Sequence, residues 1–109
     1  MKLPTEVFGD VVVVHTPEEL SSDTAGQLES FLTSLERSNV IVDLDGSETI
    51  ESTGLEALLA AQEALRALAG DLKLSTSNPA NRKILEITRL DQSLEVFDSV
   101  IDAVKSFNP

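Results

Sequence analysis

The stretch from residue 40 to residue 65, VIVDLDGSETIESTGLEALLAAQEAL, contains a complete strand–loop–helix unit. Its first five residues are almost continuously apolar, which is typical of a β-strand covered on both faces. Leucines then recur at helical spacing, which predicts an amphipathic helix whose core face carries Leu55, Leu58, Leu59, Leu65 and Leu68. The loop between them is rich in acids and hydroxyls and ends in Ser52-Thr53-Gly54. Loops at the carboxyl ends of parallel strands often carry binding sites, so this loop is the first candidate for function.

The sequence on both sides continues this alternation of strands and helices. Upstream, residues 7–8 and 11–14 predict two strands around a Gly9-Asp10 turn, followed by a helix whose inner face carries Leu28, Phe31, Leu32 and Leu35 and which ends at Ser38-Asn39. Downstream, Ala69-Gly70-Asp71 predicts a helix end, residues 72–75 a strand, Asn78-Pro79 a helix start, and residues 94–97 a last strand. Asp98 would then cap a final helix with Val100, Ile101, Val104 and Phe107 inside.

The predicted order of elements is β-β-α-β-α-β-α-β-α. Such alternation indicates an α/β fold with a mixed, mostly parallel sheet and four helices. A length of 109 residues suits one domain spanning residues 1–109.

Composition narrows the range of partners and locations. The net charge is −11, which repels nucleic acid and anionic lipid surfaces and favours a protein partner with a basic surface, although solubility alone would also explain it. There is no cysteine, so disulfides and thiolate chemistry are excluded. No apolar run is long enough to cross a membrane, and the N-terminus lacks the pattern of a signal peptide. We therefore expect a cytoplasmic protein.

The sequence lacks the usual signatures of an enzyme. The single histidine, His15, ends a strand, and a strand-end histidine usually has no special role. There is no G-x-S-x-G nucleophile motif and no glycine-rich phosphate loop, and the acids do not have the spacing of a calcium loop. We predict no catalytic residue, no metal site and no cofactor.

Ser52 and Thr53 allow two interpretations. Thr53 with Glu56 fits a helix capping box, a structural role. Gly54 is then unexpected, because glycine inside a helix costs about 1 kcal/mol relative to alanine, but it would let another backbone or a phosphate approach closely. Ser52 could be presented for phosphorylation at the same time, because the start of a helix tolerates a phosphate.

The residues from 40 to 107 carry a recognisable series. Val42-Asp43-Leu44, Ser52-Thr53-Gly54-Leu55, Gly70, Pro79, Leu85 and Phe97-Asp98-Ser99 follow one another in an order that is similar to the STAS domain, and specifically to single-domain anti-sigma factor antagonists. Two positions depart from the family pattern. Glu51 stands where an aspartate is usual, and Pro17 to Asp23 replaces a Gly-x-Leu-Asp stretch.

The resemblance implies a switch between protein partners. Such an antagonist binds an anti-sigma factor that is also a serine kinase, and so releases the sigma factor. The kinase, which binds the ATP, phosphorylates the serine that corresponds to Ser52, and a PP2C-type phosphatase reverses this. The antagonist is a monomer and not an enzyme. The partner-binding residues implied here are Glu19, Leu20, Asp23, Asp45, Glu51, Ser52, Thr53, Gly54 and Leu55.

Two other functions remain open at this point. STAS-like proteins also serve as constitutive accessory subunits of lipid-transport ATPases or of stress-sensing assemblies, without phosphorylation. A small enzyme or ligand-binding module would need a pocket with strongly shifted carboxylates, of which the sequence gives no sign.

Overall fold

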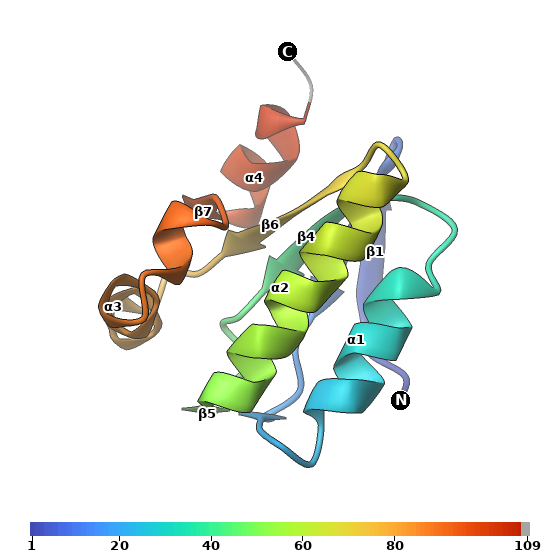
Figure 1. Ribbon diagram of the computed structural model, residues 1–109. Coiled ribbons are helices and arrows are strands. Elements are labelled where there is room, and N and C mark those ends of the chain that lie inside the picture. Colours follow the sequence, from blue (N-terminus) through green and yellow to red (C-terminus); the bar gives the residue numbers. More distant parts are fainter. Residues whose placement is uncertain (108–109) are drawn as a thin grey trace.

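The predicted order of the main elements is confirmed in the computed structural model, which describes residues 1–107 (Figure 1). The main sheet has the strand order β1-β2-β4-β6-β7. Its strands are β1 (Thr5–Phe8), β2 (Val11–His15), β4 (Asn39–Asp43), β6 (Asp71–Ser75) and β7 (Val96–Phe97). Only the β1–β2 pair is antiparallel, and the other three pairs are parallel. The sheet is therefore mixed and mostly parallel, as expected.

Helices cover both faces of this sheet. They are α1 (Ala25–Thr33), α2 (Ser52–Ala67), α3 (Pro79–Ile87) and α4 (Val100–Ser106), with a short 3₁₀ helix, η1 (Leu90–Gln92), after α3. Figure 1 shows α1 and α2 side by side across one face of the sheet, and α4 lies on the other. Within residues 1–107, no helix is long and apolar enough to cross a membrane.

The core has two parts because side chains alternate along each strand. Val12, Val14 and Val42 point toward α1 and α2, whereas Val11, Val13 and Ile41 point toward α4. The three apolar residues of β4, Val40 to Val42, have no exposed surface. The prediction that this strand is covered on both faces is confirmed.

The face covered by α4 contains a buried lysine. Lys73 Nζ donates to Ser106 Oγ at 2.9 Å and lies 4.2 Å from the centre of the Phe107 ring. The ammonium therefore sits at the carboxyl end of α4, where a positive charge is favourable. This contact links α4 to β6, the strand next to the edge strand β7.

A second, two-stranded parallel sheet was not predicted. It joins β3 (Glu19–Leu20) to β5 (Thr49–Ile50), two segments that the sequence pattern assigned to loops. Strands of two residues have no measurable periodicity, so only tertiary pairing reveals them.

Several predicted ends of elements were wrong. The first helix ends at Thr33, with Ser34 as its C-cap, rather than at Ser38-Asn39, and Asn39 already belongs to β4. Ser99 caps the final helix in place of Asp98, and its side chain accepts a hydrogen bond from the Asp102 amide. The last strand is confined to Val96–Phe97.

Two leucine or isoleucine side chains expected in the core face solvent instead. Leu68 is 67% exposed, because α2 has ended and the left-handed Ala69 (φ 64°) turns the chain. Ile101 is 65% exposed, because α4 is a short helix that packs through Ala103 and Val104 on its other side.

Candidate functional site

The loop before α2 is held by backbone pairing with the segment before α1. The amides of Glu48 and Thr49 both donate to the Glu18 carbonyl, and the Glu51 amide donates to the Leu20 carbonyl at 2.7 Å. The buried Ser47 hydroxyl also bonds to Thr16 Oγ1 at 2.7 Å. These contacts bring two sets of predicted site residues, 19–23 and 51–55, to the same end of the molecule.

Gly54 makes the closest of these contacts possible. A β-carbon placed on Gly54 would lie 2.9 Å from the carbonyl carbon and oxygen of Leu20. Real side chains do not approach so closely, so any other residue would push β3 and α2 apart. The expectation that Gly54 allows another backbone to come near is confirmed.

The structure rejects the capping-box interpretation of Thr53. The residue that caps α2 is Glu51, with extended backbone angles (φ −106°, ψ 162°) and no side-chain cap bond. Ser52 and Thr53 are already the first two residues of the helix. Their amides belong to the first turn of the helix, where N–H groups have no carbonyl acceptor within the helix.

The two hydroxyls have opposite surroundings. Ser52 is exposed, and within residues 1–107 its hydroxyl has no hydrogen-bond partner. The Thr53 hydroxyl is buried and also lacks a partner among the described residues. Thr53 lines a groove of about 370 Å³ between α1 and α2, whose other walls are Ser22, Ala25, Gly26, Glu29, Glu56, Ala57 and Ala60.

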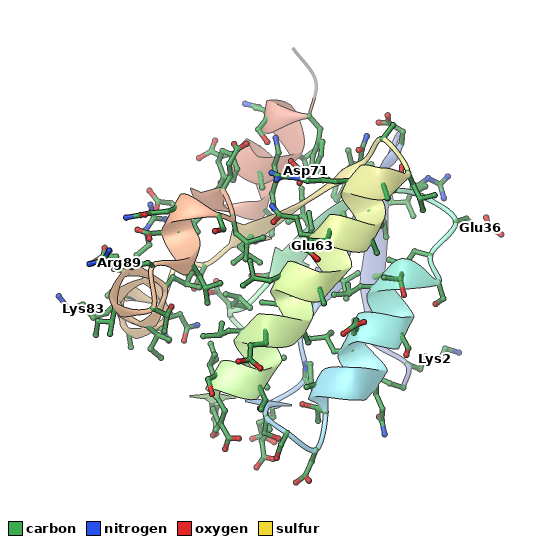
Figure 2. All side chains as sticks on the ribbon, viewed as in Figure 1. Lys2, Glu36, Glu63, Asp71, Lys83 and Arg89 are labelled. Carbon is green, nitrogen blue, oxygen red and sulfur yellow. The ribbon has the colours of Figure 1, made fainter. Side chains whose placement is uncertain are left out.

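Carboxylates gather around this end of the molecule. The exposed acids in residues 18–29 and 45–56 are Glu18, Glu19, Asp23, Glu29, Asp45, Glu48, Glu51 and Glu56, and these two segments contain no lysine or arginine. In Figure 2, oxygen-tipped side chains cluster where α2 begins, whereas the labelled Lys83 and Arg89 project from the region of α3. We call these eight acids the acidic end.

Asp45 differs from the other acids because its carboxylate is already bonded. It accepts hydrogen bonds from Thr76 Oγ1 at 2.8 Å, from the Ser77 amide at 2.9 Å and from Ser77 Oγ at 2.7 Å. Partial burial acts to raise the pKa of Asp45, but the bonds from Ser77 and Thr76 outweigh it, and the pKa is lowered. Asp45 thus ties the loop after β4 to the loop after β6.

Some of the predicted partner-binding residues are exposed, and others are buried beneath them. Glu19, Asp23, Glu51 and Ser52 are exposed. Leu20, Gly54 and Leu55 are buried and present no side chain to a partner, so their part is to hold the surface in place. Sequence reasoning did not single out Glu18 or Glu29, although the absence of lysine and arginine from residues 3–36 was a signal.

His15 also has surroundings that the sequence did not suggest. Its ring nitrogens contact two carboxylates, Asp43 at 2.9 Å and Glu6 at 2.6 Å. The partners come from neighbouring strands, which sequence spacing alone could not reveal. Within residues 1–107, no three histidine, aspartate or glutamate side chains form a group placed to hold a metal ion.

Comparison with known proteins identifies the family. The sequence profile described as "STAS domain" matches residues 2–103, so the chain belongs to the STAS domain family. No curated protein matches the sequence significantly.

Solved structures with the same fold include an anti-sigma factor antagonist from Mycobacterium paratuberculosis, at 26% identity and a TM-score of 0.83 over 96% of this chain and 92% of that one. The antagonist SpoIIAA in its unphosphorylated form matches at 18% identity and a TM-score of 0.78, over 97% and 96% of the two chains. A sulfate transporter family protein from Wolinella succinogenes matches at 22% identity and a TM-score of 0.76, over 93% of this chain and 87% of that one.

Proposed function

We propose that this STAS domain is an anti-sigma factor antagonist controlled by phosphorylation of Ser52. In its unphosphorylated form it binds an anti-sigma factor that is also a serine kinase, and the sigma factor is released. The kinase binds the ATP and phosphorylates Ser52, which ends the complex. A PP2C-type phosphatase restores the binding form. The chain acts as a cytoplasmic monomer that is a ligand and a substrate, and it catalyses no step itself.

The presentation of Ser52 carries this proposal. Its hydroxyl is exposed at the first position of α2, while the residues on either side are fixed: Glu51 by its bond to Leu20 and Gly54 by its contact with the same residue. A kinase could therefore reach the hydroxyl without unfolding the helix. The fold would also survive the modification, because the first amides of a helix and its dipole accommodate a phosphate.

The acidic end favours a basic partner surface. Eight exposed carboxylates without a lysine or arginine in the same segments create a negative field that would attract such a surface and speed the encounter. The walls of the groove between α1 and α2 are mostly small residues, Ala25, Gly26, Ala57 and Ala60, which allow close packing. Ser52, at the start of α2, does not line this groove but a smaller one, whose walls include Leu59, Thr88 and Leu90.

A phosphate would block this partner by packing rather than by long-range repulsion. It adds about −1.5 to −2 charges, which a basic partner would attract at a distance. Within a close-packed interface, however, the bulky and strongly hydrated group must either be buried or hold the two surfaces apart. The switch therefore requires that Ser52 lies inside the interface and not at its rim.

The decisive experiment uses the serine kinase encoded nearest to the gene for this chain. The two proteins are incubated with Mg-ATP, and residues 40–66 are analysed by mass spectrometry. We expect one phosphate on the wild-type chain and none on Ser52→Ala, with Thr53→Val as the matched control that still accepts phosphate. Phosphate on Thr53 instead of Ser52, or none while the complex persists with ATP, would refute the proposed switch.

The second candidate is a constitutive accessory subunit. It is supported by the likeness to the Wolinella structure, which is described as a sulfate transporter family protein. In that case the same surface would dock a partner, such as a transporter or a stress-sensing assembly, and Ser52 would stay unmodified. A complex that is equally stable with Ser52→Asp and with the wild type would favour this candidate.

A further inference from the structure

The imidazole of His15 bridges three neighbouring strands. Nδ1 lies 2.9 Å from Asp43 Oδ2 on β4, and Nε2 lies 2.6 Å from Glu6 Oε1 on β1. A neutral imidazole has one N–H donor and one acceptor nitrogen, and an ionised carboxylate only accepts. Both contacts are satisfied only when both ring nitrogens carry protons. The geometry is therefore that of an imidazolium between two carboxylates.

The surroundings favour this charged form. The hydrogen bond with Glu6 is the largest cause, and with the bond and charge of Asp43 it raises the pKa of His15, while partial burial acts in the opposite direction. Among the described residues, Glu6 and Asp43 are the charged groups that form ion pairs with His15. No lysine or arginine in residues 1–107 pairs with either carboxylate.

The two carboxylates are not equivalent. Asp43 is 14% exposed in its side chain and also accepts from the Asp45 amide at 3.3 Å and from Ser75 Oγ at 3.4 Å. The side chain of Glu6 is 55% exposed and bonds, within residues 1–107, to His15 alone. When His15 loses a proton, the N–H that remains is best kept on Nδ1, facing the less hydrated Asp43. The lone pair on Nε2 then faces the Glu6 carboxylate, and the exposed Glu6 side chain can rotate away to be hydrated by solvent.

Apart from its backbone ladder with β2, strand β1 has few contacts that hold it to the sheet. It is the edge strand of the sheet, and all four of its residues are exposed. The Glu6–His15 contact is the single side-chain hydrogen bond of β1 in the described part of the chain. We propose that His15 is a proton-dependent latch, which holds β1 to the sheet through Glu6 when protonated and releases that contact when neutral.

The backbone register shows which amides would report on the latch. The His15 amide donates to the Pro4 carbonyl, and the register pairs Glu6 with Val13 and Phe8 with Val11. Because inward and outward bonding alternates along an antiparallel strand, the amides of Glu6 and Phe8 point toward β2. Opening of β1 would expose these two amides to exchange.

The test combines two measurements by NMR from about pH 5 to about pH 9, the range in which histidine titrates. One follows the His15 ring, whose signals are unambiguous because it is the only histidine. The other follows hydrogen exchange of the Glu6 and Phe8 amides, as protection relative to the unfolded rate. In the wild type, protection should fall by about twofold to fivefold as His15 deprotonates, as expected for a partly exposed ion pair.

Glu6→Gln should lower the pKa of His15 and remove the pH-linked fall in protection, because glutamine can bond to either form of the ring. Glu36→Gln is the matched control, since exposed Glu36 lines a groove with Thr5 and Val7 of β1 but does not contact His15. Two results would overturn the latch. One is hydrogen-exchange protection of these amides that stays constant while His15 titrates, and the other is a fall in protection that is the same in Glu6→Gln as in the wild type. Neither result depends on phosphorylation of Ser52.

Discussion

Gly54 lies directly against the backbone of Leu20, so closely that a β-carbon would come within 2.9 Å of the Leu20 carbonyl. This contact joins the first turn of α2 to β3, two segments separated by more than thirty positions in the sequence. It fixes the position of the first turn of α2, which contains Ser52, relative to β3. Four predictions follow from this arrangement and from the groups around it.

Replacing Gly54 by alanine should destabilise the protein. Alanine would gain about 1 kcal/mol in helix propensity, but the overlap with Leu20 should cost more, for a net loss of about 1–2 kcal/mol in the free energy of unfolding. Gly26→Ala is the matched control, because nothing lies within 4 Å of a β-carbon there in α1, and it should be neutral or stabilising. Chemical denaturation measures both, and a Gly54→Ala variant as stable as Gly26→Ala would show that β3 moves away without cost.

Substitution of Ser52 should separate binding from stability. Ser52→Ala removes a hydroxyl without a hydrogen-bond partner in the described residues, so the free energy of unfolding should change by less than about 0.5 kcal/mol. Ser52→Asp should be similarly stable, because a negative charge is favourable at the start of a helix. If Ser52 lies within the partner interface, only the aspartate variant loses binding. Calorimetry of the complex and thermal unfolding of each variant test this, and a large loss of stability in Ser52→Ala would instead assign Ser52 a structural role.

Thr53→Val should stabilise the protein. The Thr53 hydroxyl is buried without a partner among the described residues, and burying such a group costs about 1–3 kcal/mol. Valine keeps the shape and removes the polar atom, so we expect a gain of roughly 1 kcal/mol, measured by denaturation with urea. A loss of stability would mean that a water molecule satisfies the hydroxyl in solution.

The bonds to Asp45 should contribute stability that is lost in acid. Because its pKa is lowered in the folded state, the contribution is complete above the unfolded value of 3.8 and disappears as the pH falls through the lower folded pKa. Asp45→Asn should therefore be less stable than the wild type at neutral pH, and the difference should shrink below about pH 4. The control is Glu63→Gln, a change at an exposed acid of α2 that Figure 2 labels. A difference from the wild type that is constant from neutral to acid pH would show that the charge of Asp45 plays no part.

The sequence alone determined the order of strands and helices, the doubly covered strand β4 and the position of Ser52 at a strand–loop–helix junction. These features depend on periodicity and on residue types within a few positions of one another, which a sequence displays directly. The charge of the acidic end was visible in the same way, as a run without basic residues.

The tertiary structure decided where the helices end and which distant segments contact one another. Thr53 and Glu56 have the spacing of a capping box, yet Glu51, which pairs with Leu20, caps the helix two residues earlier than that motif requires. The β3–β5 sheet, the approach of Gly54 to Leu20 and the bridge from His15 to Glu6 and Asp43 each join residues far apart in the chain. Such contacts depend on how complete elements pack together, and no local pattern of residues encodes that packing.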